Sequence, residues 1–526
     1  MAGPSGNGHV FVVYDEGMLA HAHMPMLQKK HPEKPSRLTT IHALLGQLGL
    51  LQRCDCEAIK PREATDAEIL RAHSPEHLAE VRQITADVAR SPTNRELREP
   101  DGPGGIYYSP DSLHAGLLAA GCVIEMSEHV LRLHAEEQAA KDSGCGVAIQ
   151  KLPVSALALV RPPGHHAGYD DTPGHRAEGF CFFNSVACAA RTAIARGLAQ
   201  RVLIVDYDVH HGNGTERIFY EASDVMYMSI HRYGRNFYPE TGALDDAGEG
   251  AGLGRFTLNL PWTQTGYGDA EYIAACHLLL LPVAKAFDPQ LVLVSAGFDA
   301  AEGDVQGGMR VTPTGFAQMT RLLSTLNKPM GLALEGGYNQ GVTANCVAEV
   351  TRALLGDVPV LGAMEAAEST AVSLQAEQQL RAAIALQRTH WPVLGSDAHV
   401  ALVEHFFNAA RRQGSRTHRV GSLRVQQAHG LAPLKATKPP AKPIAKHLAK
   451  GTGAAKPKPE HAIAGGGVTI AATDAAVADA MQSAEMGSSS GTPLAGERGN
   501  GASDAGRGAG SGAYSPNEKR QRVCSS

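Results

Sequence analysis

The feature that most constrains the fold is a short apolar run that passes directly into glycine and polar residues, repeated along the chain. The runs are VLIV before DYDVHHGNG, starting at residue 202, LVLVSAGFDA from residue 291 and MGLALEGGYN from residue 330. Helix-like patterns such as DAEYIAACHLLLLPVAKAF separate them. Buried strands that alternate with helices predict an α/β fold with one large, doubly wound, mostly parallel sheet and helices on both faces. Ligands bind at the carboxyl ends of the strands in such sheets, so we expect the polar residues after these runs to meet in one crevice.

Carboxylates and a histidine follow the first run at alternate positions. In an extended segment Asp206, Asp208 and His210 would point to one side, because side chains alternate along a strand. Taken alone, such residues can equally satisfy the backbone groups of a loop. The second run adds Asp299, and an Asp, His and Asp set leaves a coordination position open for water and a substrate carbonyl. This set suits Zn²⁺, although Fe²⁺ or Co²⁺ would also fit.

Two further motifs carry groups that can move protons or stabilise charge. RPPGHHAG places His165 and His166 in tandem in a loop bracketed by Pro and Gly, a poor position for filling a core. Imidazoles titrate near pH 7, and two neighbours with different partners can hold different protonation states. LEGGYN delivers Tyr338 at a glycine-rich strand end, where its phenol could donate a hydrogen bond to a developing oxyanion. The alternative is an ordinary tyrosine at the rim of a cleft.

The composition changes near residue 426. Residues 426–526 are dominated by Ala, Gly, Ser, Pro and Lys. They offer too little apolar surface to offset the entropy of ordering, so we expect a disordered tail that serves as a linker or docking segment. KRQR at residues 519–522 would suit a nuclear import signal, although a solvated terminus explains it equally well. Residues 396–425 are expected to form a helical extension or linker.

Charge and hydropathy limit the partners. Residues 409–526 carry 17 Lys and Arg against 7 Asp and Glu, so that residues 1–408 have a net charge of −15 within a total of −5. An acidic body disfavours direct binding of nucleic acid and mildly favours cationic substrates. No uninterrupted apolar run approaches the roughly 18 to 20 residues that cross a bilayer, and the N-terminal residues have neither signal nor transit character. We expect a protein of the nucleus, the cytoplasm or both, with no membrane association.

A set of motifs taken together resembles a known family. RPPGHHA, GFCFFNSVA, VDYDVHHGNGTE, SAGFDAAEGD and LEGGYN, in this order and at these spacings, are similar to the class II histone deacetylases of the arginase-deacetylase fold. The resemblance covers roughly residues 9–395, a catalytic domain with HPEKPSRL near its start and LQAEQQLRAAIALQRTHW near its end. It implies a zinc-dependent enzyme that hydrolyses N6-acetyl-lysine in proteins to lysine and acetate.

The resemblance also implies two cation sites. Its zinc ligands match Asp208, His210 and Asp299. The family has an inner site for a monovalent cation, here expected to be K⁺. The residues that match it are Asp206, Asp208 and His210, through their main-chain carbonyls, with Ser229 and Ile230.

The proton-transfer residues follow from the same resemblance. His165 and His166 match the tandem acid/base pair, and Tyr338 matches the oxyanion donor. Asp206 would support His165 and Asn213 would support His166, and an amide at the latter position is of the class II type. One class II branch carries His in place of the tyrosine and is catalytically poor. Tyr338 therefore places this chain with the active type.

The family lines its acyl-lysine tunnel with two aromatic rings. Phe180 matches one of them, and Tyr238 stands where phenylalanine is more usual, which would make that wall slightly more polar. Gly179, Gly336 and Gly337 are expected to line the same tunnel.

Rival functions remain open at this point. A deacetylase of acetylated polyamines or other small molecules would share the fold and the metal site. A deacetylase-like scaffold in a repressor complex is a second rival, although the intact ligands and tyrosine argue against inactivity. Arginase-type hydrolysis is disfavoured because a two-metal cluster would need further ligands in these motifs. The sequence leaves the substrate undecided among histone tails, tubulin, other proteins and polyamines.

Overall fold

The structure is a computed structural model that describes residues 9–102, 105–143, 152–169, 177–246, 248, 255–369 and 371–414. The chain divides into two compact units, Met1–Ala428 and His429–Ser526, and all described residues belong to the first. The tail predicted over residues 426–526 therefore lies outside the described residues. Of the predicted extension over residues 396–425, the described part forms one helix, α15 (Asp397–Gly414).

A single sheet of seven strands forms the centre of the first unit, and every strand pair in the described residues is parallel. The strand order is β1-β2-β7-β6-β3-β4-β5. The strands are β1 (Val10–Tyr14), β2 (Ser155–Leu159), β3 (Val202–Asp206), β4 (Val225–Arg232), β5 (Thr257–Trp262), β6 (Leu291–Ala296) and β7 (Met330–Leu334). Five of them are buried along their whole length, as expected where helices cover both faces. The predicted α/β class with one large parallel sheet is confirmed.

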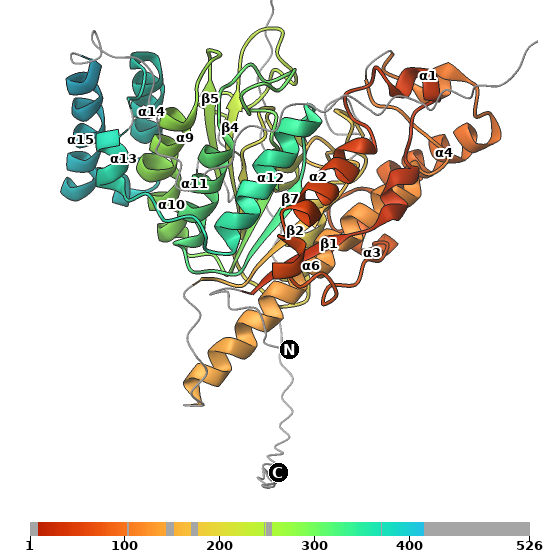
Figure 1. The fold of residues 1–526 in the computed structure, drawn as a ribbon, viewed down its shortest axis with the longest axis horizontal. Coiled ribbons are helices and arrows are strands. Elements are labelled where there is room, and N and C mark those ends of the chain that lie inside the picture. Colours follow the sequence, from red (N-terminus) through yellow and green to blue (C-terminus); the bar gives the residue numbers. More distant parts are fainter. Residues whose placement is uncertain are drawn as a thin grey trace, which may run out of the picture. The chain divides into compact units, whose positions relative to one another are not determined.

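Helices pack against the sheet in two groups (Figure 1). In one group α2 (Ser36–Gln47), α12 (Gln340–Leu354) and α11 (Pro313–Ser324) lie side by side. In the other group α6 (Ser112–Asp142) packs against α7 (Ser185–Ala195) and against strands β2 and β7. The long helix α6 is drawn in orange in Figure 1 and extends beyond the sheet. Near the β5 edge, α14 (Leu374–Gln387) contacts β5, while α13 (Ala363–Ser369) contacts α15.

The remaining helical segments complete the described part of the unit. They are η1 (Glu16–Ala20), α1 (Pro25–Gln28), η2 (Leu51–Arg53), α3 (Asp66–Ile69), α4 (Pro75–Arg90), α5 (Arg95–Arg98), α8 (Asn213–Phe219), α9 (Asp269–Ala275), η4 (Cys276–Leu280), α10 (Leu281–Phe287) and η5 (Pro392–Gly395).

Two motif asparagines begin helices that leave the sheet edge. Asn184, in GFCFFNSVA, caps α7, and its Oδ1 accepts a hydrogen bond from the backbone of Ala187 (3.0 Å). Asn339, in LEGGYN, caps α12 and accepts from the backbone of Val342 (3.4 Å). An asparagine side chain satisfies backbone donors that the first helical turn leaves unpaired. These caps fix where each loop ends.

One apolar stretch, Asp269–Phe287, is long and apolar enough by composition to cross a membrane. It consists of α9, η4 and α10, and η4 is a π-helical turn. Pro282 lies just after this turn, and a proline within a helix removes a backbone donor and crowds the preceding turn. Because 78% of its most apolar part is buried inside the structure, the stretch resembles the core helix of a globular domain and is weak evidence for a membrane span.

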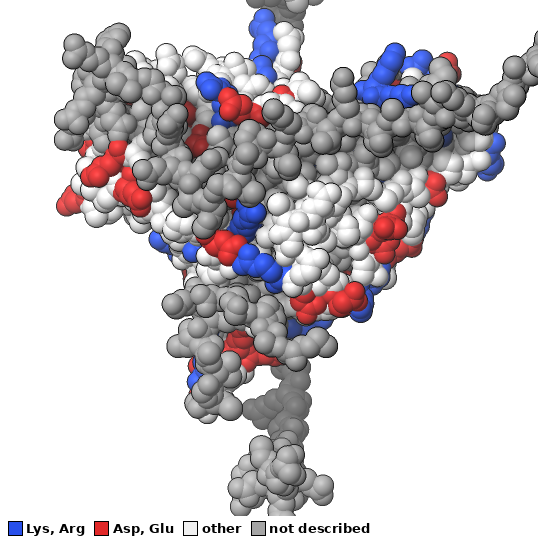
Figure 2. Space-filling model, viewed as in Figure 1, with Lys and Arg blue, Asp and Glu red and all other residues white. Residues whose placement is uncertain are grey.

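Charged side chains on the face drawn in Figure 2 are interspersed, with Lys and Arg scattered among Asp and Glu. The described residues on this face show no gathered basic patch of the kind that tracks a phosphate backbone.

Candidate active site

Polar residues that follow four neighbouring strands meet at one edge of the sheet. Strands β2, β7, β6 and β3 lie next to one another, and parallel strands end at the same edge. The functional candidates come directly after these strands. They are His165 and His166 after β2, Tyr338 after β7, Asp299 after β6, and Asp208 and His210 after β3.

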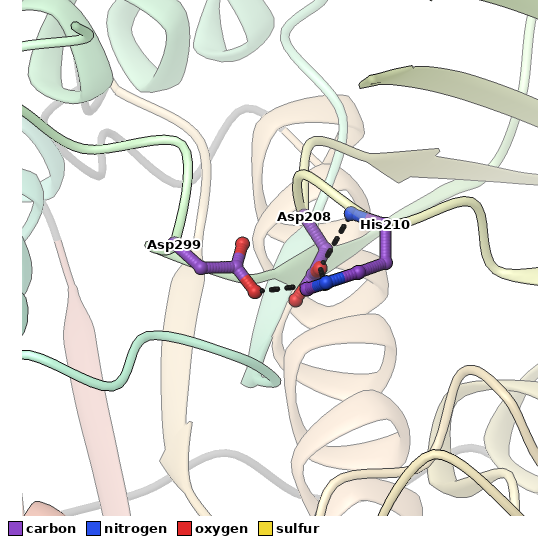
Figure 3. A group of neighbouring side chains, drawn as sticks. All are labelled: Asp208, His210 and Asp299. Carbon is purple, nitrogen blue, oxygen red and sulfur yellow. Dashed lines mark hydrogen bonds and ion pairs between the residues drawn. The ribbon is translucent and has the colours of Figure 1, made fainter. Parts of the chain in front are cut away.

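Asp208, His210 and Asp299 converge into one buried cluster (Figure 3). Their ligand atoms all lie within 4.8 Å of one another. His210 Nδ1 is 3.1 Å from Asp208 Oδ1 and 3.1 Å from Asp299 Oδ2. Among the residues that the structure describes, this is the only such cluster of His, Cys, Asp or Glu side chains.

Backbone groups and glycines hold the two carboxylates in place. The Val209 backbone N–H donates to Asp299 Oδ1 (2.8 Å), and the Gly336 backbone N–H donates to Asp208 Oδ2 (2.8 Å). A Cβ atom at Gly297 would lie 2.0 Å from Asp208 Oδ2, and one at Gly336 would lie 2.3 Å from Asp299 Oδ2. Only glycine allows the strand ends to approach the carboxylates so closely.

The electrostatics of this cluster favour a bound cation. Burial and the charge of Asp208 raise the pKa of Asp299 to about 7. Burial opposes ionisation of Asp208, but His165 and His210 outweigh it and lower the pKa of that carboxyl. Burial would lower the pKa of His210, but Asp299 and Asp208 raise it to about 9. Two carboxylates and an imidazole without solvent need a compensating charge, and two oxygen donors with one nitrogen donor suit a divalent metal such as zinc.

The position of Asp206 differs from the extended arrangement expected from alternation. Strand β3 ends at Asp206, so that Asp208 and His210 lie in the following loop. The Asp206 carboxylate faces a tandem histidine instead of the cluster, with Oδ2 located 3.0 Å from His165 Nδ1. The alternation argument fails here because it holds only while the backbone stays extended.

His165 lies next to two carboxylates, those of Asp206 and Asp208. Besides contacting this imidazole, Asp206 Oδ2 accepts a hydrogen bond from the Tyr227 hydroxyl (3.1 Å). Burial would lower the pKa of His165, but the charges of Asp206 and Asp208 outweigh this effect and raise the pKa to about 10. His165 is therefore protonated at neutral pH in this arrangement.

His166 has a neutral partner. Its Nδ1 lies 2.7 Å from Asn213 Oδ1, and its ring centroid is 4.0 Å from that of His165. Burial, together with the neighbouring His165 and His210, lowers the pKa of His166 well below its usual value. The carboxylate partner and the amide partner thus leave the pKa values of the two imidazoles shifted in opposite directions.

Glu335 is a site residue that the sequence interpretation missed. Its Oε2 accepts hydrogen bonds from the backbone N–H groups of Gly164 (2.7 Å) and His165 (3.2 Å). Burial raises the pKa of Glu335 to about 7. Glu335 is buried. It could have been found in the sequence because a carboxylate directly after an apolar strand, as in LEGGYN, is unusual.

Tyr338 is positioned by two residues that also escaped prediction. Asp304 Oδ2 accepts from the backbone N–H of Tyr338 (2.7 Å) and of Asn339 (2.9 Å). The Arg37 guanidinium lies 5.2 Å from the centre of the Tyr338 ring and donates to the Gly337 carbonyl (2.7 Å). Burial and the charges of Asp299 and Asp208 raise the pKa of Tyr338, which keeps its phenol protonated.

A cavity of about 460 Å³ leads to this cluster. Its lining includes His166, His210 and Tyr338 together with the predicted tunnel residues Phe180, Tyr238 and Gly179. The remaining lining residues are Asp101, Gly105, Ile106, Glu178 and Gln306. The Phe180 and Tyr338 rings meet edge to face at 5.7 Å, and Tyr238 leaves 43% of its surface exposed.

Gly336 and Gly337 were expected to line the substrate tunnel, and the structure places them beside it. Neither is among the residues that line the cavity. Gly336 packs against the cluster carboxylates, and Gly337 has a φ of 114°, a conformation that favours glycine in the turn before α12. Their role in this structure is to shape the loop that follows β7.

The residues predicted to bind a monovalent cation come from β3, the loop after it and the adjacent strand β4. Asp206 in β3 is opposite Ser229 in β4 in the sheet register, and Ile230 follows Ser229. Both Ser229 and Ile230 are buried, and Ser229 Oγ lies 2.8 Å from His231 Nδ1.

Comparison with known proteins identifies what the chain resembles. Residues 31–354 match the family model described as the histone deacetylase domain. Histone deacetylase 15 of Arabidopsis thaliana is 36% identical over 419 residues, which cover 78% of this chain and 69% of that protein. Polyamine deacetylase HDAC10 of Mus musculus is 40% identical over 397 residues, 74% of this chain and 55% of that protein.

Further matches extend the comparison. Histone deacetylase 6 of Caenorhabditis elegans is 38% identical over 403 residues, 74% of this chain and 39% of that protein. The chain thus covers less than two thirds of the length of two of these three relatives. Among solved structures, the crystal structure of the HDA15 HD domain matches with a TM-score of 0.61 and 35% identity, and the match covers 74% of this chain and 97% of that one.

Proposed function

Because this chain belongs to the histone deacetylase family, we propose that it is a zinc-dependent deacetylase that hydrolyses N6-acetyl-lysine in proteins to lysine and acetate. The observation that carries the proposal is the buried Asp208, His210 and Asp299 cluster. Its member His210 lines one cavity together with His166 and Tyr338. Metal-assisted amide hydrolysis needs all three kinds of group.

Asp208, His210 and Asp299 would hold the zinc ion. When bound, Zn²⁺ supplies Lewis acidity, which polarises an amide carbonyl and lowers the pKa of a coordinated water. His166, which is neutral at pH 7, can accept the proton of the attacking water. Protonated His165 keeps positive charge beside the developing oxyanion, and the Tyr338 phenol donates a hydrogen bond to it. The proton taken from water then passes from the tandem pair to the lysine amine as the C–N bond breaks, which leaves acetate and free lysine.

We further propose a structural K⁺ at the inner site. Its ligands would include the main-chain carbonyls of Asp206, Asp208 and His210, with Ser229 and Ile230 from the neighbouring strand. The adjacent register of β3 and β4 supports this placement. Dialysis against Na⁺-free buffer with and without KCl, followed by thermal melting, tests it; K⁺-dependent stabilisation is expected.

Acetylated polyamines are the second candidate substrate. The support is that polyamine deacetylase HDAC10 of mouse and of Homo sapiens is 40% and 41% identical to this chain. The charged residues that line the cavity, apart from histidines, are Asp101 and Glu178, both acidic. An acidic mouth suits a polyamine and also a lysine-rich protein segment, such as a histone tail or a tubulin loop. We also propose that the protein acts in the nucleus or the cytoplasm and that it can recruit proteins of a repressor complex.

One experiment tests the function and ranks the substrates. The purified full-length protein would be incubated with acetylated histone peptide, acetylated tubulin and N8-acetylspermidine, with and without a chelator. We expect acetate release from the protein substrates, loss with the chelator and recovery on adding Zn²⁺. Asp208→Asn should lose bound metal and activity together, because it replaces an anionic ligand with a neutral one, whereas Asp245→Asn at an exposed position serves as the control.

The result separates the rival functions. Release from acetylspermidine alone would assign the chain to small-molecule substrates. Stoichiometric zinc without turnover of any of the three substrates would support a scaffold and overturn the proposal.

A further inference from the structure

We propose that Glu178 is a positioning residue that fixes the orientation of the Asn213 amide and, through it, the tautomer of the His166 ring. The inference rests on the proposed function, because it assigns a role to a residue beside the acid/base pair. It begins from a chain of two contacts. Asn213 Nδ2 donates to Glu178 Oε1 (2.8 Å), and Asn213 Oδ1 lies 2.7 Å from His166 Nδ1.

The chemistry of the carboxylate decides which way the amide faces. A carboxylate only accepts hydrogen bonds, whereas an asparagine amide has one donating and one accepting end. Glu178 therefore binds the Asn213 nitrogen and leaves the Asn213 oxygen toward the imidazole. An oxygen at that place requires the proton on His166 Nδ1, so the Nε2 lone pair remains free to accept a proton. Without Glu178 the amide could rotate and present its nitrogen to the ring.

A tight turn places the Glu178 side chain. Residues 178–181 form a turn in which the Cys181 backbone N–H donates to the Glu178 carbonyl (2.8 Å). Its central residues, Gly179 and Phe180, both have positive φ values of 56° and 70°. A left-handed conformation is uncommon for phenylalanine and persists only where surrounding contacts hold it.

The same turn packs directly on the histidine. A Cβ atom at Gly179 would lie 2.3 Å from His166 Cδ2, so the turn touches the face of the ring. The His166 backbone N–H donates to Cys181 Sγ (3.4 Å). Glu178 is thus attached to a segment that contacts His166 through its backbone, and any shift of the turn would displace the ring and its partner together.

Tyr238 also lies beside the Glu178 carboxylate. Burial and the charge of Glu178 raise the pKa of Tyr238, so its phenol remains a neutral hydroxyl beside that carboxylate. The Tyr238 ring also packs edge to face on the His166 ring, with centroids 4.9 Å apart. The arrangement distinguishes the two histidines: His165 contacts a carboxylate directly, whereas His166 meets one through an amide.

Steady-state kinetics on an acetyl-lysine peptide, with the full-length zinc-loaded protein, test the relay. Glu178→Met removes the acceptor and should lower kcat roughly 10- to 100-fold with KM nearly unchanged, as expected when the partner of a catalytic imidazole is lost. Glu178→Gln retains an acceptor oxygen and should restore most of kcat. Glu221→Met, which makes the same change at an exposed position, should match the wild type.

The decisive comparison uses Asn213. In an Asn213→Ala background, Glu178→Met should cause no further loss, because the path to His166 is already cut. An equal loss in both backgrounds, or a loss that falls on KM, would overturn the proposal and make Glu178 a substrate contact or a purely structural residue.

A readout independent of turnover separates this inference from the proposed function. The ¹⁵N shifts of the His166 ring, assigned by difference with His166→Phe, should show the Nδ1–H tautomer in the wild type and a mixture in Glu178→Met. Unchanged shifts would refute the positioning role even in an active enzyme. Conversely, a wild-type protein that turns over no acetylated substrate would refute the deacetylase function, while the shifts still report on Glu178.

Discussion

At the scale of single residues, the site combines charged side chains with buried side chains that remain neutral. The Asp208 and Asp299 carboxylates, next to His210, carry the negative charge that a metal ion would balance. His166 and Tyr338 are held in their uncharged forms by burial and by the charges around them. In the proposed reaction His166 accepts the proton of the attacking water, and Tyr338 donates a hydrogen bond to the oxyanion.

Tyr338→Phe tests the oxyanion role. The substitution removes only the hydroxyl, so the ring should still pack on Phe180 and face Arg37. We expect zinc content and melting temperature to stay close to wild type, while kcat falls by roughly two to three orders of magnitude, the usual effect of deleting one oxyanion donor. The loss should fall on kcat more than on KM, because the hydroxyl binds the oxyanion more strongly than the ground-state carbonyl. A near-normal kcat would remove Tyr338 from the mechanism.

At the scale of elements, strand ends and helix starts set the geometry of the site. The turn between β7 and α12 contains Glu335, Gly336, Gly337 and Tyr338. It contacts both the Asp208, His210 and Asp299 cluster and the tandem histidines. Gly336 must be glycine because a side chain there would collide with the carboxylates of Asp208 and Asp299. Gly337 favours glycine because its φ is positive.

Gly336→Ala is therefore expected to disturb the Asp208, His210 and Asp299 cluster. The new methyl group would lie 2.3 Å from Asp299 Oδ2 and 2.5 Å from Asp208 Oδ2, both held by the backbone. We expect weaker zinc binding and lost activity, measured by metal analysis and acetate release. Gly341→Ala is the matched control: it lies in α12, its nearest neighbour is 3.9 Å away, and alanine favours a helix. Equal zinc content in the two variants would contradict the steric argument.

The start of α3 makes stability depend on pH. Glu68 completes a capping box with Thr65 and accepts hydrogen bonds from Arg62 and Arg196. Burial opposes ionisation of Glu68, but Arg62 and Thr65 outweigh it and lower its pKa from 4.5 to about 2. A lowered folded-state pKa stabilises the protein above the unfolded value, and this contribution is lost as the pH falls from about 4.5 toward about 2.

Glu68→Gln should reveal that contribution. At pH 7 it should lower the free energy of unfolding by about 1.5 to 3 kcal/mol, the range for hydrogen bonds to a charged group. Between pH 4.5 and pH 2 its melting temperature should fall less steeply than that of the wild type. Parallel curves over that interval would show that Glu68 does not carry the acid sensitivity.

At the scale of the whole molecule, all proposed catalytic and metal-binding residues lie between residues 165 and 338, inside the matched family domain of residues 31–354. The basic, low-complexity residues 426–526 contribute none of them. Their composition is typical of linkers and docking segments, which bear on partners and location more than on chemistry.

Removal of residues 426–526 should therefore leave kcat/KM on a small acetyl-lysine substrate within about twofold of the full-length value, because such a segment is expected to add no core contacts. Activity and circular dichroism of the protein ending at residue 425 check this. Loss of most activity in a truncated protein that is still folded would move the domain boundary. Activity toward intact protein substrates and cellular location are the properties expected to change.

The sequence by itself determined the fold class and pointed to the residues proposed for the chemistry. Apolar runs that end in glycine and polar residues are local patterns, and burial on both faces of a parallel strand produces them directly. Asp208, His210, Asp299, the tandem histidines and Tyr338 could be found because each follows such a run.

The tertiary structure decided which residues support them. Arg37 reaches Gly337 across 300 positions in the chain, and Glu335 reaches the backbone of His165 across 170. These contacts depend on strand order, in which β7 lies between β2 and β6, and no local pattern contains that order. The same holds for Glu178, whose contact with Asn213 exists only because the turn over His166 and the loop after β3 meet at one edge of the sheet.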